Sequence, residues 1–131
     1  MSQDNVEVVR RMYEAFHRGD AEGSLSYFDP EVVVDASIRM DAGIGHGREE
    51  LSAIIAKWIG AFDDWREDIE EIRGLGSQVL VISTQRGRGK GSGAEVKLRY
   101  GVLYEMSGGK ITRLTMYDSP SAALEAAGLS K

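Results

Sequence analysis

The sequence predicts an α+β domain, with helices first and a run of hairpin-connected strands after them. Residues 4–62 contain two long segments whose apolar side chains recur at helical spacing. Residues 65–118 instead carry stretches that alternate with a period of two, separated by short Gly-rich turns. Helices followed by consecutive hairpins are typical of α+β folds and not of alternating parallel-sheet folds.

Four segments have helical patterns, and their ends are marked by residues that favour helix termini. Gly19 is the expected end of the first helix, because glycine readily adopts the left-handed conformation that closes a helix. Asp20 is the expected N-cap of the second. The predicted helices are residues 4–18, a short segment after Asp20, residues 48–62, and an Ala-rich segment from Pro120 to Gly128.

Five segments have strand patterns, being short and either β-branched or alternating. Residues 38–47, IRMDAGIGHG, have three glycines and no steady period, and we therefore expect a loop there. The predicted strands are residues 31–37, 65–73, 78–86, 95–106 and 110–118.

Length and composition restrict the classes of protein to which the chain can belong. Its 131 residues are expected to form one domain, residues 1–131. The absence of cysteine excludes disulfides, thiolate zinc sites and a cysteine nucleophile. No apolar run approaches the roughly 18 residues of a membrane span, and no signal-peptide pattern is seen. We therefore expect a cytoplasmic protein without a membrane partner.

Charge argues against a nucleic-acid partner. The net charge is −5, whereas general nucleic-acid binders carry a basic surplus. The basic residues of 86–99 and the acidic residues of 63–71 fall on neighbouring predicted strands. Charge pairing across these strands is the simplest explanation for both groups.

Four segments resemble the SnoaL-like, polyketide cyclase-like branch of the nuclear transport factor 2-like superfamily. They are NVEVVRRMYEAFHRGD (5–20), FDPEVVVD (28–35), GREEL (47–51) and GGKITRLTMYDSPSAALEAAGL (108–129). The resemblance implies a cone-shaped domain, in which a strongly curved mixed sheet wraps around helices and encloses an apolar cavity. Members include ketosteroid isomerase, scytalone dehydratase, limonene epoxide hydrolase, polyketide cyclases and non-catalytic binding proteins, so the fold leaves the activity open.

The ketosteroid isomerase residues do not transfer to this chain. The resemblance places the isomerase tyrosine at Met12, with Tyr13 one residue later. It places the isomerase base at Ala36, one residue after Asp35, and the second aspartate near Val102. Adjacent strand residues face opposite sides of a sheet, so either Asp35 points away from the cavity or the register is shifted by one. Steroid isomerisation is therefore not expected.

Two other relatives suggest different carboxylates. Polyketide cyclases of the SnoaL type have an aspartate base on the final strand, and Asp118 matches that position. Limonene epoxide hydrolase has an Asp-Arg-Asp set, for which Asp35, Arg99 and Asp118 are the candidates. Arg99 alternates with Tyr100, however, so only one of these two side chains can face the cavity.

Each candidate catalytic residue also has a structural interpretation. Asp118 follows Leu114 and Met116 on the face expected to point inward, where burial would suit a general base, but it could instead cap the last helix. Asp35 is either an acid or base or an exposed residue at the end of a strand. We keep both interpretations for each.

The two histidines are candidates of different kinds. His46 precedes the third helix beside the expected cavity entrance, and it is either an acid or base or a solvated loop residue. His17 is expected at the surface, near the end of the first helix. The pair shows no metal-binding spacing, so no metal and no cofactor are expected.

Aromatic and methionine side chains are expected to line the cavity. Tyr13, Tyr100 and His46 are candidate donors to a developing oxyanion. The expected lining residues are Met12, Tyr13, Phe16, Phe28, Trp58, Tyr100, Tyr104 and Met116.

We expect a small-molecule acid/base enzyme (a cyclase, isomerase or hydrolase) that binds an apolar substrate, or else a non-catalytic ligand-binding or interaction domain. Leu80, Ile82 and Leu103 fall on the second face of the sheet, which would otherwise be polar. A homodimer formed through the sheet is therefore also expected.

Overall fold

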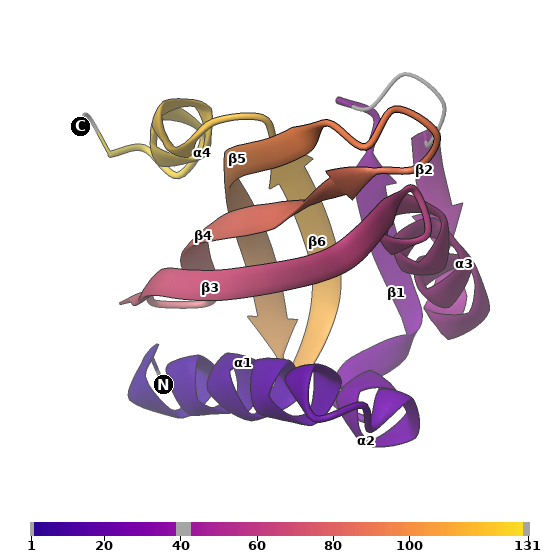
Figure 1. Ribbon diagram of the computed structural model, residues 1–131. Helices are drawn as coiled ribbons and strands as arrows, with labels where there is room; N and C mark the ends of the chain where they lie inside the picture. Colours follow the sequence, from indigo (N-terminus) through magenta and orange to yellow (C-terminus); the bar gives the residue numbers. More distant parts are fainter. Residues whose placement is uncertain (1, 39–42, 130–131) are drawn as a thin grey trace.

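The computed structural model describes residues 2–38 and 43–129, and their secondary structure is shown in Figure 1. In chain order the elements are α1 (Ser2–His17), α2 (Ala21–Leu25), β1 (Phe28–Ala36), β2 (Gly43–His46), α3 (Gly47–Ile59), β3 (Phe62–Leu75), β4 (Gln78–Gly89), β5 (Glu95–Ser107), β6 (Lys110–Tyr117) and α4 (Pro120–Ala126).

All six strands belong to one curved sheet, in the order β2-β1-β6-β5-β4-β3. Strands β3 to β6 follow one another as antiparallel hairpins, whereas β1 lies parallel to β6. Figure 1 shows α1 and α2 beneath the sheet, α3 beside β1 and β2, and α4 apart from them beyond β5. The predicted α+β fold, a curved mixed sheet around helices, is confirmed.

The local signals for helix ends are confirmed at α1 and α2. Gly19 has a φ of +85°, and the N–H of Asp20 donates to the carbonyl of Ala15 at 2.9 Å, which closes α1. The Asp20 carboxylate then accepts the N–H of Gly23 at 2.9 Å and caps α2. One residue pair, Gly19-Asp20, thus ends one helix and begins the next.

Two predictions of local structure were wrong. Within the expected loop 38–47, residues 43–46 form β2, which pairs with Val33–Ala36; residues 39–42 lie outside the described residues. This strand is too short and Gly-rich to show a period. The third helix ends at Ile59 rather than at Phe62, which begins β3.

The main core lies between the concave face of the sheet and helices α1 and α3. Its fully buried side chains include Val9, Val32, Val34, Val79 and Ile111. Leu51 is the one buried residue of α3, whereas Ile55 and Trp58 of the same helix are half-buried. That pattern indicates that much of α3 faces a space and not a packed core.

Helix α4 covers one end of the opposite, convex face. Ala123 packs there against Leu80 and Leu103, and all three are buried. The apolar residues of this face, which suggested a partner, are thus partly covered by the chain's own last helix. Whether a second copy covers the rest of the face stays a prediction.

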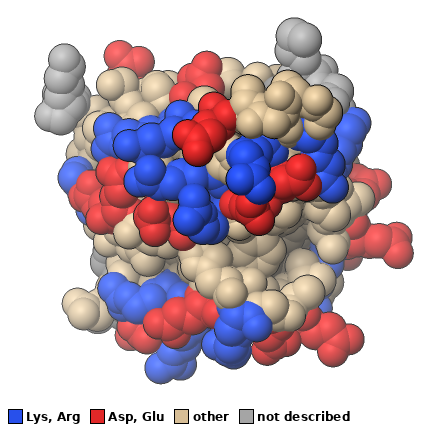
Figure 2. Space-filling model, in the orientation of Figure 1, with Lys and Arg blue, Asp and Glu red and all other residues tan. Residues whose placement is uncertain are grey.

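Charged side chains occupy much of the remaining convex face. Arg86 pairs with Asp68, and Arg88 pairs with Asp64, between β4 and β3. Arg99 of β5 reaches across β4 to bind Glu70 of β3 at 2.8 Å. The predicted cross-strand pairing is confirmed, and Figure 2 shows blue and red side chains interleaved over the upper half of the molecule.

None of the helices in the described ranges is long and apolar enough to cross a membrane.

Gly101 should be required for the close approach of α4 to the sheet. A Cβ atom at Gly101 would lie 2.3 Å from the Cβ of Ala123 and 3.3 Å from the carbonyl oxygen of Ser119. We expect Gly101→Ala to displace α4 and to lower the free energy of unfolding in urea by about 1–3 kcal/mol. Combining it with Ala123→Gly should restore part of that loss, and strictly additive losses would contradict this packing.

Candidate functional site

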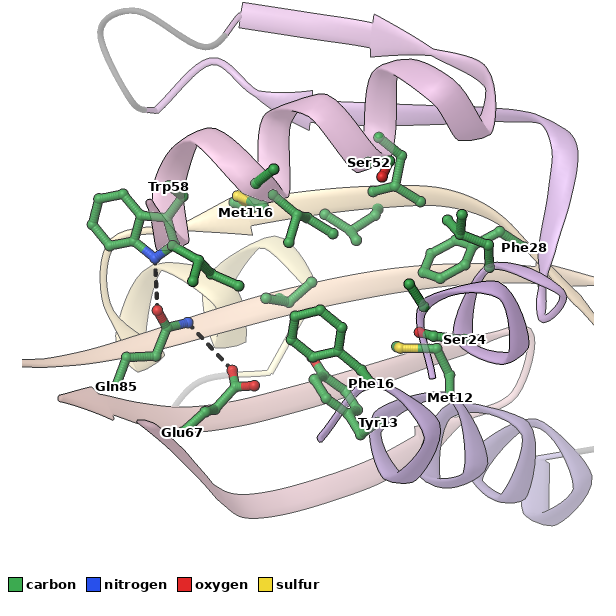
Figure 3. Close-up of a pocket in the computed structure, with 18 of the residues that line it drawn as sticks. Met12, Tyr13, Phe16, Ser24, Phe28, Ser52, Trp58, Glu67, Gln85 and Met116 are labelled. Carbon is green, nitrogen blue, oxygen red and sulfur yellow. Dashed lines mark hydrogen bonds between the residues drawn. The ribbon is translucent and has the colours of Figure 1, made fainter. Parts of the chain in front are cut away.

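A cavity of about 460 Å³ lies between the concave face of the sheet and helices α1, α2 and α3. Its wall is mostly aliphatic and aromatic, and its side chains converge from all of these elements in Figure 3. Every residue expected from the sequence to line a cavity lies in this wall, namely Met12, Tyr13, Phe16, Phe28, Trp58, Tyr100, Tyr104 and Met116.

The hydrogen-bond partners of Gln85, on β4, determine the orientation of its side-chain amide. Its Oε1 accepts the indole N–H of Trp58 at 2.7 Å and that of Trp65 at 3.1 Å. An indole nitrogen can only donate, so the oxygen of the amide must face both rings. The Nε2 group therefore faces the other way, where it donates to Glu67 at 3.3 Å (Figure 3).

Among the described residues, Glu67 of β3 supplies the one carboxylate in the cavity wall. It stands directly across from Gln85 in the sheet, and its side chain is 6% exposed. Its Oε2 accepts from Gln85, and its Oε1 lies 2.8 Å from Nε2 of His17, at the end of α1. A carboxylate buried among apolar side chains requires such partners, because an unpaired one would be costly.

His17 connects this carboxylate to the surface. Its side chain is 33% exposed, so its ring contacts both solvent and Glu67. The expectation of a surface histidine is thus only half right. Because its Nε2 lies next to a carboxylate oxygen, that nitrogen carries the proton, and His17 is a donor to Glu67.

Tyr13 and Tyr104 form a buried hydroxyl pair beside Glu67. Their oxygens are 2.6 Å apart, and the rings meet edge to face. Burial is the largest cause that raises the pKa of Tyr13 and of Tyr104, and the nearby negative charge of Glu67 raises both pKa values further. Both hydroxyls are therefore protonated donors at neutral pH.

Asp35 does not line the cavity. On β1 the buried residues Val32, Val34 and Ala36 alternate with it, so its carboxylate lies on the convex face. There it accepts from Oγ of Ser37 at 2.6 Å and from Arg113 at 3.2 Å. Hydrogen bonds from Ser37, and then the charge of Arg113, lower the pKa of Asp35.

His46 and Asp118 are also absent from the cavity wall. His46 is exposed and precedes α3, and its backbone N–H donates to the Glu50 carboxylate at 2.7 Å. Strand β6 ends at Tyr117, so the inward series Leu114, Met116 stops before Asp118, which is exposed. The expected capping role belongs instead to Ser119, whose hydroxyl accepts the N–H of Ala122 at 3.1 Å.

Glu67 and Gln85 were not predicted as site residues. The signal for Glu67 was the alternation Trp65, Glu67, Ile69, which sets an acid between two apolar residues that face one side. Over residues 2–38 and 43–129, no three His, Asp or Glu side chains gather closely enough to hold a metal ion.

Comparison with known proteins finds a matching family and similar folds. The model of the SnoaL-like domain matches residues 9–114. An uncharacterized protein of Mycobacterium tuberculosis is 28% identical over 123 residues, which cover 92% of this chain and 93% of the relative.

Two solved structures are similar at identities that show the fold alone. A nuclear transport factor 2-like protein of unknown function from Burkholderia pseudomallei is 23% identical, with a TM-score of 0.76 over 93% of this chain and 95% of the other. A hypothetical protein from Catenulispora acidiphila has a ketosteroid isomerase-like fold and is in complex with trimethylamine. It is 22% identical, with a TM-score of 0.71 over 94% and 93% of the two chains.

Asp35 should stabilise the fold in a pH-dependent way. Its folded pKa lies below the ordinary value of 3.8, so its stabilisation is complete above that value and is lost as the pH falls through the lower, folded pKa. We expect Asp35→Ala to cost about 1 kcal/mol of unfolding free energy in urea at pH 7, and clearly less at pH 2.5. Equal losses at both pH values would contradict this role.

Proposed function

The chain belongs to the SnoaL-like domain family within the nuclear transport factor 2-like superfamily, and we propose that it is an acid/base enzyme that works without a cofactor on a mainly apolar small molecule. The observation that carries this proposal is Glu67, a carboxylate 6% exposed in the wall of an otherwise apolar cavity. A desolvated, oriented carboxylate is suited to general base catalysis. Asp35, His46 and Asp118 are not chosen as the base, because none of them lines the cavity.

In the proposed mechanism, Glu67 takes a proton from a substrate carbon next to a carbonyl group. Its Oε2 is the reacting atom, because the 3.3 Å contact with Gln85 is longer than the 2.8 Å contact of Oε1 with His17. The two contacts hold the carboxylate in one orientation before the substrate arrives. His17, being partly exposed, can then exchange protons between this site and solvent.

The tyrosine pair would stabilise the enolate oxygen that forms when the proton leaves. One of the two tyrosines donates its hydroxyl proton to the other. The hydroxyl proton of the accepting tyrosine is then left to donate to another group. Because the pKa values of both phenols are raised, neither loses its proton near neutral pH. A preformed donor in an apolar site is the usual way to stabilise an oxyanion.

The alternative is a binding domain of the same fold without catalysis. It is supported by the fact that both oxygens of Glu67 already have partners. The enzyme is favoured because two kinds of polar group, a carboxylate and a phenol pair, meet in one cavity. A cavity that only binds an apolar ligand has no use for a buried carboxylate, whose desolvation is costly.

Catalysed hydrogen exchange at a carbon tests the proposal without knowledge of the natural substrate. In D₂O, we expect the protein to accelerate deuterium incorporation next to the carbonyl of 1-tetralone, an apolar bicyclic ketone, as followed by proton NMR. Glu67→Gln should reduce the accelerated rate by about 100-fold or more, because general base catalysis typically contributes that much.

Asp68→Asn is the matched control, since it removes a negative charge from the same strand at a side chain that is 70% exposed. This variant should exchange like the wild type. If Glu67→Gln exchanges as fast as the wild type, or if the wild type gives no rate above buffer, the binding domain becomes the better description.

A further inference from the structure

The described part of the cavity wall has an acidic side chain and no basic one. Among the described residues that line it, none is Lys or Arg, and Glu67 is the one acidic side chain. A carboxylate or phosphate placed in this space would find no counter-ion and would be repelled by Glu67. The desolvation of such an anion would therefore not be offset.

The partners of Glu67 leave its charge available to a ligand. Gln85 is neutral, and His17 donates one hydrogen bond from the side of α1. His17 contacts Oε1 alone, so among the described residues Oε2 is bonded to the neutral amide of Gln85 and to no charged group. A ligand cation would supply the missing partner, and the attraction would be strong because the site is buried.

Aromatic rings surround the same end of the cavity. Trp58 meets Tyr100 edge to face at 5.8 Å, and Phe16 meets Trp65 at 6.0 Å. The N–H edges of both indoles are bound to Gln85, so the rest of each ring is what a ligand in the cavity can contact. Ring faces attract cations, and indole does so best.

We propose that this cavity selects its ligand by charge: it takes apolar molecules that carry an amine, with the ammonium group beside Glu67 and the two indoles, and it excludes carboxylates and phosphate esters. The inference rests on the proposed function in taking the same cavity as the ligand site, but it requires no turnover.

Three probes with one benzyl group test the selection. Benzyltrimethylammonium and neopentylbenzene have the same shape, but the first has a positively charged nitrogen where the second has a neutral carbon. Phenylacetate is the anionic probe. Binding is measured by titration calorimetry and by tryptophan fluorescence at pH 8. The wild type, Glu67→Gln and the control Asp68→Asn are compared, with circular dichroism to establish that each is folded.

We expect Glu67→Gln to weaken binding of the ammonium probe about tenfold, while neopentylbenzene changes less than twofold. For each probe, the Kd of Glu67→Gln is compared with the Kd of the wild type. The two probes are not compared directly, because the cation costs more to dehydrate than the neutral probe. Phenylacetate should fail to bind the wild type, and Asp68→Asn should behave like the wild type. Equal losses for the ammonium and neutral probes, or binding of phenylacetate to the wild type, would overturn the proposal.

A second measurement uses the wild type alone, in case Glu67→Gln does not fold. The N-methyl protons of bound benzyltrimethylammonium should give nuclear Overhauser effects to the rings of Trp58 and Trp65, and their absence would equally overturn the proposal. The two proposals can fail separately. Charge selection without ketone exchange refutes only the reaction, and ketone exchange without charge selection refutes only the ligand class.

Discussion

An indole N–H group can only donate a hydrogen bond, and this constraint determines the arrangement of the cavity. Trp58 comes from α3 and Trp65 from β3, and both donate to the same oxygen of Gln85 on β4. The amide can therefore present only its N–H₂ group to Glu67. A single side chain thus joins the end of α3 to the sheet and holds the carboxylate on which the proposed chemistry depends.

Much of the fold could be predicted because its signals are local. Helical and period-two patterns gave the order of elements, the pair Gly19-Asp20 gave one helix end and the next helix start, and complementary charges gave the pairing of β3 with β4. Strand β2 could not be found this way, since four residues with two glycines show no period. The resemblance to SnoaL-like domains supplied the curved sheet, which no local pattern contains.

The carboxylate in the cavity was harder to predict because side-chain direction depends on register. In β3 the acids Glu67, Asp68, Glu70 and Glu71 lie close together, and the β3–β4 register shifts between Ile69 and Glu71. Counting by twos from Ile69 selects Glu67, whereas counting from Ile72, beyond that shift, selects Glu70 and Asp68. The strand pattern therefore does not by itself identify the acid that faces inward. For Asp35 and Asp118, of the two interpretations kept for each, the structure supports the one outside the cavity. Asp35 faces the opposite side of β1 from the buried residues, and Asp118 lies beyond the end of β6.

The most direct test of this arrangement is hydrogen exchange at the indole nitrogens, because the chain has only two tryptophans and so two indole resonances. Both should be protected from exchange with solvent in the wild type. Both should lose protection in Gln85→Leu, which offers no acceptor. An indole that exchanges freely in the wild type, or protection that survives in Gln85→Leu, would contradict the central place of Gln85.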